Sequence, residues 1–186
     1  GTTRYAYNAS GILGANHLSL VQNPFGNVSY GYDELGRATA RTVDGATESR
    51  TFNLLGAVSS ETNGLGTFAY TYTNNTREIA SATLPNGQST TFSYLPNTND
   101  RLLASILYKR SGGATLSQWS YTYNAQREIL TWSQQRDSNP ARVYTLGYDA
   151  ADQLTSAGLT NPTATYAYTY DPAANRLAES INAVTT

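Results

Sequence analysis

The sequence repeats one short pattern from end to end, in which aromatic residues at alternate positions are followed by a turn. YGYDELGRAT at residues 30–39, WSYTYNAQREIL at 119–130 and YAYTYDPAANRL at 166–177 are three copies. A recurring short period predicts a repeat architecture in which each copy packs mainly on its neighbours. Alignment on the aromatic residue before the turn gives eight positions, 20 to 29 residues apart: Tyr7, Tyr32, Phe52, Tyr72, Tyr94, Tyr123, Tyr148 and Tyr170.

The residues before each turn alternate between aromatic and small side chains, as in FAYTY at 68–72 and YAYTY at 166–170. Successive side chains of a β-strand point to opposite faces, so this period of two predicts a strand with one aromatic face and one face of Thr, Ser and Ala. Tyr and Thr also favour strands by propensity. The first half of each repeat is therefore expected to be a β-strand.

The turn that follows begins with Asp or Asn and often ends with Gly, as in Asp33–Gly36, Asn53–Gly56 and Asp149–Asp152. An Asp or Asn side chain can accept hydrogen bonds from its own main chain, and Gly tolerates positive φ, so each tetrad predicts a tight reversal. A second β-prone run comes next, such as residues 37–43. Each repeat is thus expected to be a β-hairpin.

The connections between hairpins are rich in Gly, Asn and Pro, for example at residues 44–45 and 85–87. Strands joined by such turns run up and down through one antiparallel sheet. The predicted fold is all-β: tandem hairpins in one continuous, curved or spiralling antiparallel sheet, a partial shell, with a single array over residues 1–186. An open array of this kind leaves two sheet edges available to other strands.

Composition supports a folded chain and excludes several partners. Apolar residues make up 39% and charged residues 13%, unlike a disordered chain. The net charge of −1 offers no field for nucleic acid or an anionic membrane, and no apolar run is long enough to span a bilayer. Without cysteine there is no disulfide framework. Because the chain starts with Gly and the repeat is running by Tyr5, we expect a piece of a longer polypeptide.

The motif Y-x-Y-D-x-x-G-R at Tyr30–Arg37, with its variant Y-x-Y-D-P-x-x-N-R-L at Tyr168–Leu177, resembles the YD repeat. This repeat occurs in bacterial Rhs proteins, in the B and C components of Tc toxins and in teneurins, and the resemblance covers essentially the whole chain. Several positions depart from the pattern and leave the turn type of individual repeats open. They are Phe52 for a tyrosine, Thr73 and Leu95 for Asp or Asn, two extra residues before Arg101, and Arg127 for the turn Gly.

The resemblance implies a β-shell, which encloses a cytotoxic C-terminal domain in Rhs and Tc proteins and forms an extracellular scaffold in teneurins. It implies a non-catalytic structural segment of a secreted or cell-surface protein, bacterial rather than eukaryotic, whose partners are neighbouring YD repeats and an enclosed toxin domain. The aspartyl-protease-like site of the family has no counterpart in this sequence. The residues expected to carry the structural role are Tyr30, Tyr32, Asp33, Gly36, Arg37, Tyr70, Tyr72, Tyr121, Tyr123, Tyr148, Asp149, Tyr168, Tyr170 and Asp171.

A second function, glycan or protein binding, rests on Trp119 and Trp132, which with the tyrosine rows could form a stacking platform for sugars. The alternative is that these rings pack on their cross-strand neighbours. Members of the family have been linked to carbohydrate binding, which keeps an adhesion module open.

No catalytic, cofactor or metal site is expected. A glycosidase needs two carboxylates roughly 5 to 10 Å apart, but Asp33, Asp149 and Asp171 occupy the same motif position in different repeats, which favours turn capping. His17 is the only histidine and lacks a G-x-S-x-G partner motif, so we expect a packing or surface role. Residues 97–100 are rich in oxygen ligands but lack the spacing of a calcium-binding EF-hand.

Overall fold

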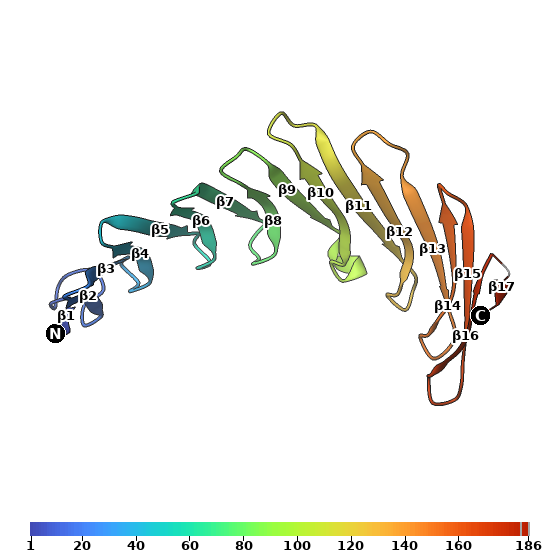
Figure 1. Cartoon of the computed structure of the whole chain (residues 1–186), viewed down its shortest axis with the longest axis horizontal. Coiled ribbons are helices and arrows are strands. Elements are labelled where there is room, and N and C mark those ends of the chain that lie inside the picture. Colours follow the sequence, from blue (N-terminus) through green and yellow to red (C-terminus); the bar gives the residue numbers. More distant parts are fainter. Residues whose placement is uncertain (183, 186) are drawn as a thin grey trace. The chain divides into compact units, whose positions relative to one another are not determined.

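The computed structural model describes residues 1–182 and 184–185, and it is built almost entirely of β-strands (Figure 1). A single 3₁₀ turn, η1 at Asn97–Asn99, is the helical element of the described residues. The chain divides into two compact units, Gly1–Gly87 and Gln88–Thr186. In each unit the strands pair antiparallel with the next strand in the chain, which confirms the prediction of an all-β fold made of hairpins.

The N-terminal unit contains four of the aligned repeats, each as one hairpin. On one side of the sheet the connections between hairpins are two residues long, as between Val43 and Ala46. There Asp44 and Gly45 both have positive φ, 48° and 91°, as a type I′ turn requires. The strands are β1 (Arg4–Tyr7), β2 (Leu18–Asn23), β3 (Gly26–Tyr32), β4 (Ala38–Val43), β5 (Ala46–Phe52), β6 (Val58–Asn63), β7 (Gly66–Tyr72) and β8 (Ile79–Thr83).

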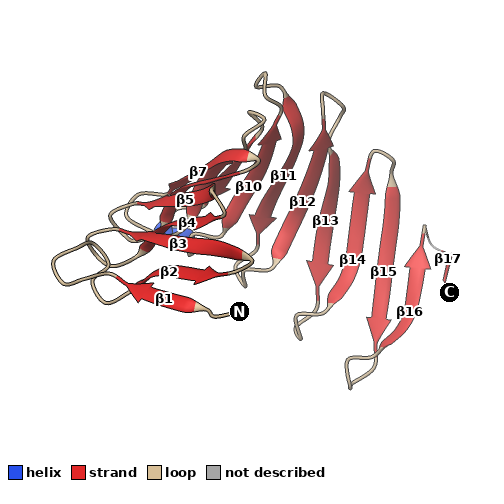
Figure 2. Cartoon of the chain, turned by 60° about the vertical axis from the view of Figure 1, so that its left-hand side comes forward, coloured by secondary structure: helices blue, strands red, loops and turns tan. Residues whose placement is uncertain are grey.

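The C-terminal unit contains the other four repeats and has longer strands. Figure 2 shows β12 to β15 side by side with alternating directions, in agreement with their antiparallel ladders. The turn η1 lies in the first hairpin of this unit. The strands are β9 (Ser89–Tyr94), β10 (Leu103–Lys109), β11 (Thr115–Tyr123), β12 (Ile129–Arg136), β13 (Arg142–Tyr148), β14 (Leu154–Thr160), β15 (Ala164–Tyr170), β16 (Arg176–Ile181) and β17 (Val184–Thr185).

The two faces of the strands differ as the alternation predicts. In β7 and β15 the aromatic positions are half-buried and the Thr and Ala positions between them are exposed. Among the described residues only Ala157 and Leu159 are buried hydrophobic residues. Stability therefore comes from rings that lie over the sheet and from the ladders. A tyrosine ring suits this half-buried position because its hydroxyl can form a hydrogen bond while the rest of the ring covers apolar surface.

Each of the eight repeats contains a β-bulge at the same place, directly after the turn. The aligned aromatic residue ends the first strand, and the second strand then contains one residue without a partner. At Tyr32, for example, the partner is Ala38 while Gly31 pairs with Ala40, so Thr39 is extra. A bulge bends and twists its strand and redirects the neighbouring side chains. The extra residues are Ser19, Thr39, Ser59, Ala80, Ala104, Leu130, Thr155 and Leu177.

No helix in the described residues has the length and apolar character that a membrane-spanning helix requires.

Candidate functional site

The aligned tyrosines bond one repeat to the one before it. In each case the hydroxyl donates to the main-chain carbonyl of the first residue of the preceding strand, with O···O distances of 2.6 to 3.0 Å. We call this contact the inter-repeat tyrosine bond. The five examples are Tyr32 to Leu18, Tyr72 to Val58, Tyr123 to Leu103, Tyr148 to Ile129 and Tyr170 to Leu154.

The acceptor in each bond lies directly after the preceding turn, at the bulge, where it pairs with the aligned aromatic residue of the repeat before. Leu154, which accepts from Tyr170, is paired across the ladder with Tyr148, the aligned tyrosine of the repeat before. Leu103, which accepts from Tyr123, is paired in the same way with Tyr94. In the C-terminal unit the three tyrosine bonds follow one another from bulge to bulge and join consecutive hairpins. In the N-terminal unit Phe52 lies between the two bonded tyrosines and interrupts this row.

The environment of two of these hydroxyls, those of Tyr123 and Tyr148, favours the protonated form. Burial raises the pKa of Tyr123, with a smaller contribution from the nearby Tyr121. Burial also raises the pKa of Tyr148, and the Glu128 carboxylate adds to the effect. A raised phenol pKa means that the group remains an O–H donor over the whole neutral range. At these two positions the hydroxyl can therefore donate to the carbonyl oxygen throughout the neutral range.

Five of the turns share one hydrogen-bonding pattern. The side-chain Oδ1 of the first residue accepts the main-chain N–H groups two and four residues further on, and the first carbonyl accepts the N–H three residues on. The fourth residue has a φ of 60° to 74° in all five. The first and fourth residues are Asp33 and Gly36, Asn53 and Gly56, Asn124 and Arg127, Asp149 and Asp152, and Asp171 and Ala174.

The shared turn geometry is kept in the repeat that lacks the motif glycine. Arg127 stands where the motif has Gly, yet its φ of 71° matches the 73° of Gly36. A side chain in this left-handed region is strained by about 1–2 kcal/mol, so the strand pairing and the side-chain cap impose the turn even without Gly. The hydrogen bonds that main-chain N–H groups donate to the Asx side chain therefore determine the loop conformation more than the identity of the fourth residue does.

The remaining repeats have longer loops, two of them at the departures from the motif. Thr73 closes its loop with a bond from its N–H to the Glu78 carbonyl at 2.9 Å, and Leu95 bonds to Leu102 at 2.8 Å across η1. The first repeat has the longest loop, closed by Asn8 N–H to the His17 carbonyl at 2.9 Å. The His17 ring lies 5.0 Å from the Tyr32 ring, so it packs on an aligned tyrosine.

The tyrosines two positions earlier, Tyr30, Tyr70, Tyr121 and Tyr168, lie half-buried on the aromatic face. They do not take part in inter-repeat tyrosine bonds. Tyr168 instead lies under the Arg176 guanidinium, 6.0 Å from the ring centroid, and burial raises its pKa, as does Glu179 to a lesser degree. The two tyrosines of a Y-x-Y motif therefore have different roles: the second bonds to a neighbouring repeat and the first covers the sheet.

Arginine side chains near the turns also reach neighbouring repeats. The Arg37 guanidinium lies 4.4 Å from the centroid of Phe52, which has no hydroxyl with which to form a tyrosine bond. Arg77 donates to the Leu55 carbonyl at 3.0 Å. These contacts join adjacent turns within the N-terminal unit. Arg37 also pairs with Asp33 of its own turn, Nε to Oδ2 at 2.6 Å.

Trp119 and Trp132 are brought together on neighbouring strands. Their rings stack with centroids 5.8 Å apart and planes 6° apart, and Trp132 stacks in turn on Tyr144 at 4.8 Å and 13°. Tyr144 is directly opposite Trp132 in the ladder between β12 and β13. Because sugars stack on ring faces and Trp132 lies between two other rings, the geometry fits the packing alternative. Tyr144 could have been predicted by extending the period of two back from Tyr148.

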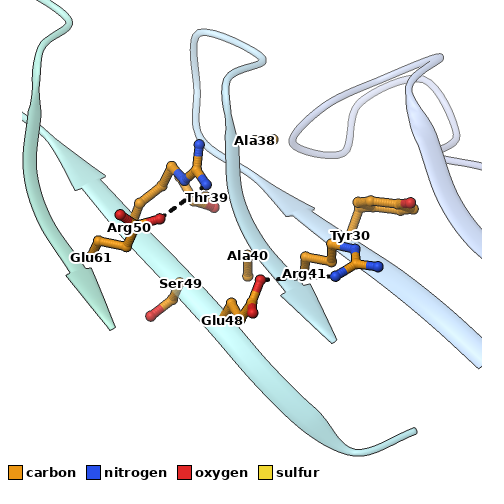
Figure 3. Close-up of a pocket in the computed structure, with 9 residues that line it drawn as sticks. All are labelled: Tyr30, Ala38, Thr39, Ala40, Arg41, Glu48, Ser49, Arg50 and Glu61. Carbon is orange, nitrogen blue, oxygen red and sulfur yellow. Dashed lines mark hydrogen bonds and ion pairs between the residues drawn. The ribbon is translucent and has the colours of Figure 1, made fainter. Parts of the chain in front are cut away.

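The aromatic face is interrupted in the N-terminal unit, where charged residues replace the expected rings. Arg41 is directly opposite Glu48, and Arg50 is directly opposite Glu61. Figure 3 shows both pairs among the residues that line a hollow of about 140 Å³, with Arg41 beside Tyr30. The ion pairs are 3.8 Å and 3.3 Å long and largely exposed, so each contributes about 0–1 kcal/mol. Opposite charges at facing positions favour the correct strand register.

The turn carboxylates make stability depend on pH. The side-chain amide of Asn175 is the main cause that lowers the pKa of Asp171, followed by the Asn175 main-chain N–H. For Asp33 burial opposes ionisation, but bonds from the main chain and side chain of Arg37 and from the Leu35 N–H outweigh it and lower the pKa. A lowered carboxyl pKa stabilises the fold above the unfolded-state pKa of about 3.9, and that contribution is lost as pH falls through the folded-state value.

We therefore expect Asp171→Asn to destabilise the protein at pH 7 and to have a smaller effect at about pH 2.5, where a larger fraction of the Asp171 carboxyl groups of the parent chain is protonated. The measurement is the free energy of unfolding by urea at both pH values. Glu34→Gln is the matched control, because Glu34 is exposed and its side chain makes no hydrogen bond in the described structure. An Asp171→Asn effect of equal size at both pH values would contradict the electrostatic account.

The geometry defines a class of protein, a tandem β-hairpin array whose consecutive repeats are joined by main-chain ladders and tyrosine bonds. No protein-family model matches the sequence, and no curated protein matches it. Among solved structures, the chain is similar to TcdB2-TccC3 without its hypervariable C-terminal region, with a TM-score of 0.61 and 19% identity over 84% of this chain. It is similar also to TcdB2-TccC3-TEV, with a TM-score of 0.60 and 18% identity over 84% of this chain.

The chain spans only 9% of each of those TcdB2-TccC3 chains. At this level of identity the likeness concerns the fold. It confirms, at the level of the fold, the resemblance to YD-repeat proteins that the motifs at Tyr30–Arg37 and Tyr168–Leu177 indicate.

Proposed function

We propose that this chain is a non-catalytic structural segment of a secreted or cell-surface Rhs/YD-repeat protein, forming part of a β-shell that surrounds or supports a toxin or effector domain. The observation that carries the proposal is the inter-repeat tyrosine bond, which recurs at the same position of five repeats. A contact repeated in this way along the chain serves to hold a wall together, since a binding or catalytic site is normally built once. The fold likeness to TcdB2-TccC3 supports the same function.

The use of the carboxylates supports a non-catalytic role. Asp33, Asp149 and Asp171 each accept main-chain N–H groups within their own turn. This is a structural use of Oδ1, and in Asp33 and Asp171 the second oxygen is bonded as well, to the Arg37 and Asn175 side chains. We assign the same capping role to these residues in the proposed shell, and the covering role to the tyrosines of the aromatic face.

The proposal is tested in the longer polypeptide, by following protease cleavage of the enclosed domain. We expect that domain to resist cleavage in the parent protein and to become sensitive when Tyr123 and Tyr148 are both changed to Ala, because two consecutive tyrosine bonds are lost. Tyr121→Phe is the matched control and should leave protection unchanged. Equal cleavage in the parent and in the double variant would argue against a shell. A catalytic rate that collapsed in a variant with an unchanged melting temperature would argue against the non-catalytic assignment.

A further inference from the structure

Two arginine side chains of the N-terminal unit come together at the turn Asn53–Gly56. Arg37 follows the turn before it and Arg77 belongs to the loop after it, so both neighbouring repeats send a guanidinium group to the same turn. A side-chain carbon placed on Gly56 would lie 3.5 Å from Nη1 of Arg37 and 3.8 Å from Nη2 of Arg77. The space that this carbon would fill therefore borders both guanidinium groups.

The glycine at position 56 is not explained by the backbone alone. Its φ of 74° suits glycine, yet Arg127 and Ala174 have φ values of 71° and 65° at the same position of their turns. The turn therefore accepts a side chain at a modest cost. The surroundings of Gly56 give a second reason for glycine, because any side chain would occupy the space beside the two guanidinium groups.

The two guanidinium groups differ in how far their charge is compensated. Nε of Arg37 pairs with the Asp33 carboxylate at 2.6 Å, and the group lies 4.4 Å from the Phe52 ring centroid. These contacts hold the group in place, while its Nη1 makes no hydrogen bond in the described structure. Arg77 is exposed and bonds only to the Leu55 carbonyl there, so no carboxylate of the described residues balances its charge. Like charges at one point repel, and a bound oxyanion would remove this repulsion.

Exposed leucines lie on the same turns as the arginine contacts. Leu54 and Leu55 belong to the turn of Gly56, and Leu35 belongs to the neighbouring turn; all three are exposed. An aliphatic surface beside a guanidinium group suits a peptide that has aliphatic residues next to a carboxylate, whereas an inorganic ion gains nothing from it. The chemistry of the surface therefore favours a peptide as the source of the oxyanion.

We propose that Arg37 and Arg77 bind the carboxylate of an Asp or Glu side chain in the space beside Gly56. The aliphatic neighbours of that acidic residue lie on the exposed leucines of the two turns. Guanidinium groups suit this ligand because their N–H donors match the two oxygens of a carboxylate. The site goes beyond the proposed function, because it assigns a partner of defined chemistry, an acidic and aliphatic peptide segment, to the turns of the array.

The test is a titration of the isotope-labelled 186-residue chain with the peptide acetyl-Leu-Glu-Leu-amide, followed by the main-chain N–H signal of Gly56 in nuclear magnetic resonance spectra. Both ends of the peptide are blocked, so the glutamate carries its only charge. We expect a saturable shift of the signal. The matched peptide acetyl-Leu-Gln-Leu-amide should bind about tenfold more weakly or less, because its neutral amide cannot form charge-assisted bonds.

Three variants of the chain locate the site. Gly56→Ala places a methyl group against both guanidinium groups and should weaken binding of the acidic peptide about tenfold. Gly45→Ala is the matched control, because Gly45 also has a positive φ but no atom within 4 Å of the added carbon, and it should bind like the parent chain. Arg77→Gln removes the uncompensated charge and should also weaken binding about tenfold. Because Arg77 is exposed, this variant keeps the test decisive if Gly56→Ala fails to fold.

Absence of a saturable shift would overturn the inference, and so would equal binding of the Glu and Gln peptides. Equal affinities of Gly56→Ala and Gly45→Ala, or an unchanged affinity in Arg77→Gln, would also overturn it, because the arginine pair would then not be the site. Sodium phosphate is titrated in parallel. If it bound at Gly56 more tightly than the acidic peptide, the site would have to be assigned to a phosphate ion and the peptide partner would be wrong.

Discussion

Tyr123→Ala is expected to lower the free energy of unfolding by about 2–3 kcal/mol. The substitution removes a half-buried ring from the aromatic face and leaves the Leu103 carbonyl without the hydroxyl that donates to it at 2.8 Å. The measurement is urea unfolding followed by tryptophan fluorescence, with circular dichroism to establish that the strand content of the variant is unchanged. The effect is large because one substitution affects two bulges, that of Tyr123 with Ile129 and that of Tyr94 with Leu103.

Two phenylalanine variants separate the hydrogen bond from the ring. Tyr123→Phe keeps the ring and should cost about 0.5–1.5 kcal/mol, the net contribution of one hydrogen bond. Tyr121→Phe is the matched control on the same strand, since its hydroxyl makes no hydrogen bond in the described structure, and should change stability by less than about 0.5 kcal/mol. Equal effects of the two variants would show that the inter-repeat tyrosine bond contributes nothing specific.

Trp132→Ala is the second large effect, about 3 kcal/mol of destabilisation. The change leaves Trp119 and Tyr144 without the ring that lies between them at centroid distances of 5.8 Å and 4.8 Å. The near-ultraviolet circular dichroism of the stacked indoles should be lost together with the stability. Trp119→Ala removes only one stacking contact and should cost less.

Ser133→Ala provides the control for the position of the stack. Ser133 is adjacent to Trp132 but lies on the other face of β12, and its replacement should stay within about 0.5 kcal/mol of the parent protein. If Trp132→Ala had a similarly small effect while Trp119→Ala abolished binding to a glycan array, the rings would have to be assigned to a ligand surface. The packing alternative requires the opposite result.

The strands and turns could be predicted because their signals are in the side chains. The period of two in FAYTY at 68–72 predicts both the strand and its aromatic face. Asp33 predicts the turn, which its side chain then caps. The unusual φ of Arg127 could not be predicted, because the turn is imposed by the main-chain bonds to Asn124 and not by the residue at the strained position.

The bulges and the tyrosine bonds leave no comparable signal. The extra residue in a bulge is Thr39 in one repeat and Leu130 in another, so no residue type marks it. The acceptor of a tyrosine bond is a peptide carbonyl, which every residue has. The sequence therefore indicates that Tyr32 belongs to a repeated motif, but not that its hydroxyl reaches Leu18.

The sequence contains the charged residues of the aromatic face but does not indicate which of them lie opposite one another. Arg41 and Glu48 are on opposite sides of a two-residue turn, and only the register of β4 with β5 puts them face to face. In the same way, the stack at Trp132 depends on the register of β12 with β13, which brings Tyr144 directly opposite. Register depends on turn geometry, so contacts across strands become predictable only after the turns are known.

The choice of a peptide carbonyl as the acceptor has an evolutionary consequence. A mutation can change the side chain of the acceptor residue without removing the atom that the phenol requires, so adjoining copies need not coevolve residue by residue. Duplication or exchange of a copy between arrays then preserves the linkage, provided that a tyrosine precedes the reversal. Such tolerance is in keeping with a shared architecture at 19% identity to TcdB2-TccC3.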